Sequence, residues 1–93
     1  MRGKLLLTLV GGARKIIDPN QLVTYGEHSL DLTDKRGQPR VIKLCRVGIR
    51  ERNAGGEENL NEYDLMMSAA ELRARLREAF LELGDTESAR TFE

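Results

Sequence analysis

RVIKLCRVGIRERN, residues 40–53, is the longest stretch with strand character in the chain. Val, Ile, Leu and Cys alternate or nearly alternate there with polar residues, which is typical of a β-strand. The stretch also holds five of the fifteen Lys and Arg residues, so this strand is expected to present a basic face. The remaining elements are expected to be organised around it.

The apolar residues of this stretch change parity part-way along it. Ile42 and Leu44 point to one face of an ideal strand. The next apolar pair, Val47 and Ile49, points to the other face. A strand that keeps a single face buried must absorb one additional residue between these pairs. The sequence therefore predicts either a β-bulge near Cys45-Arg46 or two shorter strands that meet at a bend there.

Three arginines in the second half of the stretch share one parity. Arg46, Arg50 and Arg52 are predicted to project together from the face opposite Val47. Basic residues on one face of a sheet can follow a phosphate backbone, and guanidinium planes stack on bases. Further basic residues lie in the preceding loop and at the start of the strand. The complete set of candidate nucleic-acid-binding residues is Lys35, Arg36, Arg40, Lys43, Arg46, Arg50 and Arg52.

Four shorter runs with strand character precede this stretch. They are Lys4–Val10, Arg14–Ile17, Gln21–Tyr25 and His28–Thr33. The first is almost entirely apolar, as in a strand covered on both faces. The last alternates, so that Leu30 and Leu32 are expected on a buried face. Turns are predicted at Gly11-Gly12, at Asp18-Pro19-Asn20 and in the loop Asp34–Pro39, which would join the last run antiparallel to the long stretch.

A polar loop and a helix follow. Residues 53–62 contain two glycines and several acidic residues, which predicts an exposed acidic loop. Tyr63–Met67 is expected to be a short strand. Ser68 and Glu71 then form the pattern of a capping box, which predicts a helix over residues 68–83. The apolar stripe of this helix consists of Leu72, Leu76, Ala79, Phe80 and Leu83.

These elements place the chain in the α+β class. An antiparallel sheet of four or five strands, within residues 4–52, is expected to carry the C-terminal amphipathic helix on one face. Residues 85–93 are predicted to be either one more helical turn or a frayed tail. The chain makes one domain, residues 1–93, near the lower size limit for a core that is stable unaided. A homodimer is therefore the expected state.

Residue spacing argues against catalysis and metal binding. The single histidine, His28, has no second histidine or cysteine pair with it that would form a zinc site. The acidic residues of the 53–62 loop lack the spacing of a calcium loop, and no phosphate-binding loop is present. A non-enzymatic protein without cofactor or metal is predicted. The single cysteine, Cys45, rules out a disulfide within the chain and fits a cytoplasmic location. No apolar run is long enough to span a membrane.

The net charge is zero, but the charges are unevenly distributed. Residues 1–52 hold eleven Lys and Arg against five Asp and Glu, whereas residues 53–93 hold four against ten. Three explanations remain open: attraction between the two halves within the fold, a basic face for nucleic acid, or a protein partner. Only Tyr25 and Tyr63 are expected as platforms for base stacking.

A series of features in the C-terminal half ends in a serine-capped helix. It consists of Val47, Ile49-Arg50-Glu51, the loop 53–62, Leu65-Met66-Met67-Ser68 and the helix from Ala69. This series resembles the closing section of the transcriptional positive coactivator family, small domains that bind single-stranded DNA. The resemblance implies a dimer with helices packed together and a grooved nucleic-acid face on curved strands. It also implies phosphate contacts by Arg46, Arg50 and Arg52.

Three functional hypotheses follow from these patterns. The first is a small nucleic-acid-binding protein, preferably for single-stranded DNA, that uses the basic sheet face. The alternative is a small protein-interaction module without nucleic-acid activity, such as a phage-encoded inhibitor or adaptor. The third is a structural oligomer component whose strands pair at exposed edges.

Overall fold

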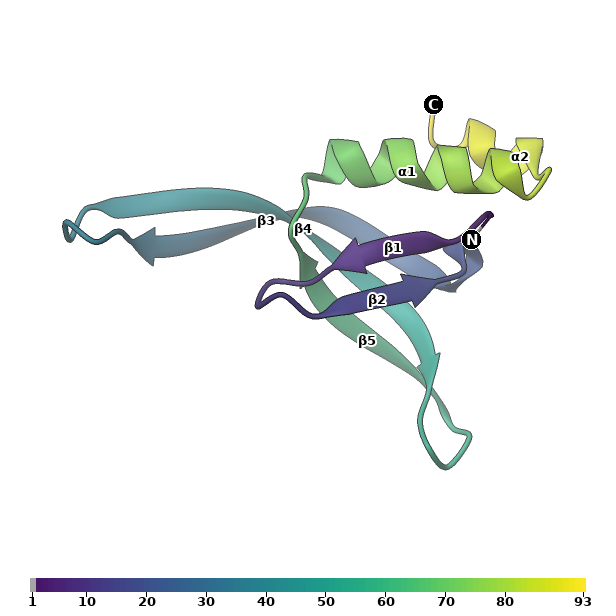
Figure 1. Ribbon diagram of the computed structural model, residues 1–93, viewed down its shortest axis with the longest axis horizontal. Helices are drawn as coiled ribbons and strands as arrows, with labels where there is room; N and C mark the ends of the chain where they lie inside the picture. The colour runs from purple at the N-terminus through teal and green to yellow at the C-terminus, as the bar shows by residue number, and fades with distance from the viewer. Residues whose placement is uncertain (1) are drawn as a thin grey trace.

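Residues 2–93 are described by the computed structural model, which contains five strands, two α-helices and one 3-10 helix (Figure 1). The strands and helices are β1 (Leu5–Thr8), β2 (Arg14–Ile17), η1 (Pro19–Gln21), β3 (Leu22–Thr33), β4 (Pro39–Arg52), β5 (Glu58–Leu65), α1 (Ala69–Glu82) and α2 (Thr86–Arg90). The α+β class predicted from the sequence is confirmed.

The strands form two antiparallel sheets, so the predicted single sheet of four or five strands is wrong. β4 lies between β3 and β5 in the larger sheet, and β1 pairs with β2 in the smaller one. An isolated bridge between Leu9 and Leu65 and a 2.8 Å hydrogen bond from Met66 N to Thr8 O link the two sheets. The β1–β2 hairpin packs against the larger sheet instead of extending it, because its inner side chains belong to the core. These side chains are Leu5, Leu7 and Ile17.

β3 is one continuous strand, although the sequence predicts two separate runs. Gly26 stands in the ladder opposite Arg46 and does not interrupt it. The register between β3 and β4 shifts only between Leu22 and Thr24. The predicted β-bulge near Cys45-Arg46 is therefore wrong, and the irregularity lies in the neighbouring strand.

The parity change in β4 has a different physical origin. Cys45, Val47 and Ile49 follow one another on the same face, and each is 0% exposed. Ile42 does not belong to that face and is 40% exposed. Leu44, on the face of Ile42, is still buried at 8% exposure, whereas Ile42 lies beyond the packed region. The strand therefore stays regular, and its first residues leave the core.

These first residues of β4 form half of a protruding hairpin, which we call the arm and define as residues 28–44. β5 ends at Leu65, opposite Cys45, so only β3 and β4 continue beyond this point. The arm projects away from the helices, and it contributes to the elongated outline of 48 × 36 × 21 Å (Figure 1). Leu32 is 42% exposed on the arm, so the expectation that it lies on a buried face is wrong.

The second projecting hairpin joins β4 to β5. The observed loop is shorter than the predicted loop 53–62, because β5 already begins at Glu58. Asn53 Oδ1 accepts hydrogen bonds of 2.9 and 3.0 Å from the Gly55 and Glu57 amides, which closes the turn. Gly56 adopts a φ of 82°, a conformation that favours glycine.

The core lies between the larger sheet, the β1–β2 hairpin and the two helices. α1 contributes its buried stripe, and α2 contributes Ala89. The sequence predicts either a helical turn or a frayed tail for residues 85–93, and the structure has the helix α2 there. The residues of α1 in this cluster are Leu72, Leu76, Ala79 and Phe80. One core thus connects elements from both ends of the chain.

Only half of the predicted capping box of α1 forms. Ser68 Oγ accepts a 3.1 Å hydrogen bond from the Glu71 amide, as predicted. The Glu71 carboxylate does not return to Ser68, because it accepts a 2.9 Å hydrogen bond from Arg75. A complete capping box occurs instead at η1, where Asp18 and Gln21 cap one another.

Candidate interaction surface

The seven basic residues predicted to bind nucleic acid are all exposed, but they do not share one face. Lys35 and Arg36 lie in the turn of the arm. Along β4, alternation places Lys43 on the face opposite that of Arg46. Arg40, Arg50 and Arg52 share the face of Arg46. The predicted common projection of Arg46, Arg50 and Arg52 therefore agrees with the strand geometry.

Arg46 is held by two neighbours on this face. Its Nε and Nη2 atoms donate to the Asp64 carboxylate over 2.9 and 3.3 Å. Its Nη2 atom also lies 2.9 Å from Nε2 of His28. The hydrogen bond from Arg46 holds the pKa of the Asp64 carboxyl below its ordinary value. Register explains this pairing, because Arg46 and Asp64 stand directly opposite each other on β4 and β5.

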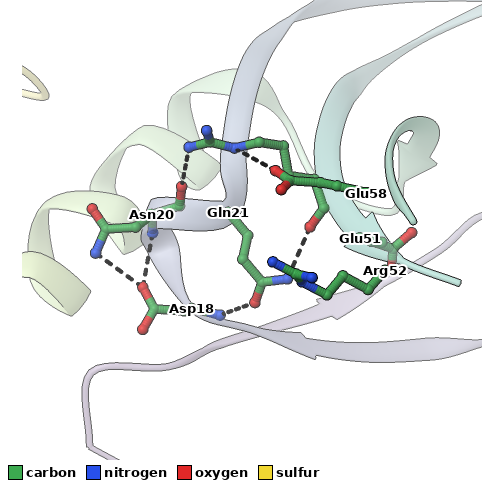
Figure 2. A pocket seen from close by; sticks show the side chains of 7 residues that line it. Asp18, Asn20, Gln21, Glu51, Arg52 and Glu58 are labelled. Atoms are coloured by element: carbon green, nitrogen blue, oxygen red, sulfur yellow. Dashed lines mark hydrogen bonds and ion pairs between the residues drawn. The ribbon is translucent and has the colours of Figure 1, made fainter. Parts of the chain in front are cut away.

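Arg50 and Arg52 lie at a shallow hollow of about 530 Å³ where η1 approaches the end of β4 (Figure 2). Arg50 donates to the backbone carbonyl of Asn20 over 3.1 Å and lies 3.9 Å from the Glu58 carboxylate. Arg52 donates to the Gly56 carbonyl over 3.3 Å. The hollow is lined by Asp18, Asn20, Gln21, Arg50, Glu51, Arg52 and Glu58.

The remaining strand cations also have acidic neighbours. Arg40 Nε lies 3.3 Å from Asp34, and Lys43 Nζ lies 3.9 Å from Glu27. Carboxylates thus stand beside Arg40, Lys43, Arg46 and Arg50. Within residues 2–93, no ion pair forms at the turn lysine and arginine. The pairs of Arg46 and Arg50 join the two halves of the sequence, so the unequal charges partly neutralise one another across β4 and β5.

Neither tyrosine is a free platform for base stacking. Tyr25 packs against Phe92, with ring centroids 6.1 Å apart, and its hydroxyl accepts a hydrogen bond from Arg73. Tyr63 donates its hydroxyl to Glu51, and the ammonium group of Lys15 lies 4.7 Å from its ring centroid. Both side chains are half-buried and are used by the fold.

The arm is the feature that the sequence reasoning missed. Leu30, Leu32 and Ile42 share one of its faces, because Leu30 stands opposite Ile42 in the ladder. Leu32 and Ile42 are 42% and 40% exposed, and Val41 on the other face is 65% exposed. The parity change in β4 was the available signal, since it separates the apolar residues of the arm from those of the core.

The arm also has a free edge along β4. Cys45 donates its amide to Met67 O over 3.0 Å, toward the β5 side. The Arg50 carbonyl accepts from Gln21 and so points to the opposite side. Odd-numbered residues of β4 therefore direct their backbone groups toward the β5 side. Because β5 ends opposite Cys45, no strand within residues 2–93 pairs with Val41 or Lys43 on that side.

Other features offer little chemistry. Burial raises the pKa of the Cys45 thiol, which keeps it protonated and unreactive. Across residues 2–93, no cluster of three or more His, Cys, Asp and Glu side chains is placed to hold a metal ion. No helix in this part of the chain is long and apolar enough to cross a membrane.

Comparison with known proteins finds no matching family model, no matching curated protein and no matching solved structure. The resemblance to the coactivator family therefore stays a prediction from the sequence.

Proposed function

We propose that this chain is a non-enzymatic protein-interaction module that binds its partner through the arm. The observation that carries the proposal is a protruding two-stranded hairpin that exposes apolar side chains and an unpaired strand edge. Arg46 and Arg50, central to the alternative nucleic-acid face, are already engaged by carboxylates and backbone carbonyls.

Physical chemistry favours a partner for such an arm. A two-stranded hairpin by itself is marginally stable in water, and contiguous exposed apolar surface marks interaction sites. Ile42 and Leu32 occupy the same face of the arm, away from the hydrophobic core. A protein that docks there buries these side chains and can extend the sheet by adding a strand.

The test compares two lysine substitutions on the same face of the larger sheet. Ile42→Lys changes the arm, whereas Leu60→Lys changes the β4–β5 hairpin at a residue that is 55% exposed. Proteins that copurify with the tagged chain from its native host are identified and then titrated with purified protein. We expect Ile42→Lys to weaken binding at least about tenfold, the effect of roughly 1.4 kcal/mol, and Leu60→Lys to leave it unchanged. Equal affinities for the two variants would contradict the proposal.

Nucleic-acid binding is the second candidate function. Lys35 and Arg36 support it, because they are exposed in the turn of the arm and form no ion pair with the described residues 2–93. Fluorescence anisotropy with a labelled single-stranded oligonucleotide over a salt series tests it. Binding should weaken as salt rises, and Lys35→Ala/Arg36→Ala should weaken it more than Arg77→Ala on α1. No binding at low salt, or binding indifferent to salt, would sink this candidate.

A further inference from the structure

We propose that the partner of the arm is a second copy of this chain, which pairs antiparallel along the free edge of β4 with a two-fold axis at Val41. This inference rests on the proposed function, since it names the occupant of the arm. The resulting sheet is continuous and runs β3–β4–β4–β3 across the two copies. The argument comes from the length of the free edge, its backbone groups and the charges of its side chains.

The free edge of one copy is as long as the segment of the second copy that pairs with it. β4 begins at Pro39, and Cys45 is already bonded to Met67. The backbone groups that remain available therefore belong to residues 39–43, and their midpoint is Val41. With the axis at Val41, the second copy's Pro39 stands opposite Lys43, so each strand starts where the other free edge ends.

Neighbouring registers are less favourable. An axis at Arg40 places this cation directly opposite its own copy, which is destabilising. An axis at Ile42 brings the second copy's Pro39 opposite Cys45, whose amide is occupied by Met67. With the axis at Val41, Arg40 stands opposite Ile42 of the second copy. No like charges then face each other, and the two Val41 side chains form a β-branched pair.

The backbone groups of this register complement themselves. Val41 directs both its amide and its carbonyl outward, so the two copies of Val41 exchange reciprocal hydrogen bonds. The Lys43 amide reaches the carbonyl of the second copy's Pro39. Proline and an exposed lysine at an edge restrict other strand pairings, because proline lacks a donor and lysine is costly to bury. These two residues therefore restrict the registers that can pair along the β4 edge, and β3 becomes the outer strand on both sides of the joined sheet.

Charge complementarity also favours a second copy. The pairing brings the turn of one arm toward the end of β5 of the other copy. That turn carries Lys35 and Arg36, whereas the C-terminal half of β5 carries Glu62 next to the Arg46–Asp64 pair. The basic and acidic halves of the sequence thus attract one another between copies as well as within each copy.

The mass in solution tests the inference. Light scattering behind a sizing column should give about twice the 10.5 kDa chain mass for the unchanged protein, with dissociation on dilution. Val41→Pro removes an amide that faces solvent in the single chain, so its arm still folds while the reciprocal bonds are lost. Val41→Thr retains the amide and serves as the matched control. We expect Val41→Pro to have the mass of a single chain and Val41→Thr to have the mass of a dimer.

Cysteine cross-linking tests the register. With an added oxidant, Val41→Cys should form a disulfide-linked dimer, because the two residues meet at the axis. Ile42→Cys should not, since it lies opposite Arg40 of the other copy. The native Cys45 is buried, so the unchanged protein provides the blank. Cross-linking of Ile42→Cys as rapid as that of Val41→Cys would overturn the register.

The possible failures are distinguishable from failure of the proposed function. A single-chain mass for the unchanged protein at all concentrations overturns the second copy as the partner. The comparison of Ile42→Lys with Leu60→Lys then still decides whether the arm binds another protein. A dimer that is equally stable with Val41→Pro and with Ile42→Lys overturns the arm as the dimer interface, and the comparison of Ile42→Lys with Leu60→Lys again decides the proposed function separately.

Discussion

Glu51 connects the two sheets through one carboxylate. Its Oε2 atom accepts a 2.7 Å hydrogen bond from Lys15 of β2. Its Oε1 atom accepts from the Tyr63 hydroxyl and, over 2.9 Å, from Asn61, both on β5. Burial by itself would raise the pKa of this carboxyl, but the hydrogen bonds outweigh that effect and lower the pKa to about 2. The charged form of Glu51 therefore stabilises the contact between hairpin and sheet.

This pKa predicts how stability depends on pH. A folded-state pKa below the usual 4.5 means that the contribution of Glu51 is complete above about pH 5 and is lost as the pH falls toward 2. Glu51→Gln should lower the free energy of unfolding at pH 7 by about 1 to 2 kcal/mol and reduce the loss of stability between pH 5 and 3. Urea unfolding at both pH values measures this. Glu78→Gln, on the exposed side of α1, is the control, and an equal pH dependence of the two variants would contradict the prediction.

At the scale of an element, α1 begins where the sequence predicts because its signals are local. The Ser68 cap and the periodic stripe that includes Leu72 and Leu76 lie within a few residues of each other. The half-formed capping box shows the limit of such patterns. Ser68 and Arg75 lie on neighbouring turns on either side of Glu71, and the Glu71 carboxylate accepts its hydrogen bond from Arg75.

Removal of the cap measures its contribution. Ser68→Ala should destabilise the protein by about 1 kcal/mol, because the Glu71 amide loses its side-chain acceptor. The midpoint of denaturant unfolding reports the change. Ser29→Ala, at an exposed position on the arm, should leave the midpoint unaltered. If both variants unfold at the same concentration, packing of the apolar stripe alone would define the start of α1.

β4 is the element for which local reasoning was least successful. Its apolar residues change parity, and a bulge was the expected response of a strand with one buried face. The strand instead changes environment: Val47 and Ile49 face the core, whereas Val41 and Ile42 belong to the arm. The register shift that does occur lies between Leu22 and Thr24 of β3, opposite Ile49 and Gly48, and it is unrelated to the parity change in β4.

At the scale of the whole molecule, the arm is separate from the core. The core cluster draws on both sheets and both helices, and it contains no residue between Leu30 and Ile42. The residues that stabilise the fold and those of the proposed binding surface therefore lie in different parts of the chain.

A shortened chain tests this separation. His28 and Leu44 stand opposite each other with backbone groups directed inward, so an Asn-Gly turn can replace residues 29–43 between them. In dilute solution the melting temperature should change by less than about 4 °C, which corresponds to about 1 kcal/mol or less. Val47→Ala, in the core, should lower stability by about 1 to 3 kcal/mol and shows that the assay is sensitive. A loss from shortening as large as that of Val47→Ala would show that the arm supports the core.

The sequence by itself determined the α+β class, α1 and its serine cap, the turn after residue 33 and the shared face of Arg46, Arg50 and Arg52. These features depend on residues close together in the chain, through capping, turn chemistry and alternation. Only the tertiary structure decided that the strands divide between two sheets, that β5 carboxylates meet the β4 arginines and that β4 continues past its neighbour into an arm. These features depend on which distant segments pair and on where that pairing stops. No local pattern of residues encodes the partner of a strand or the length over which the two strands pair.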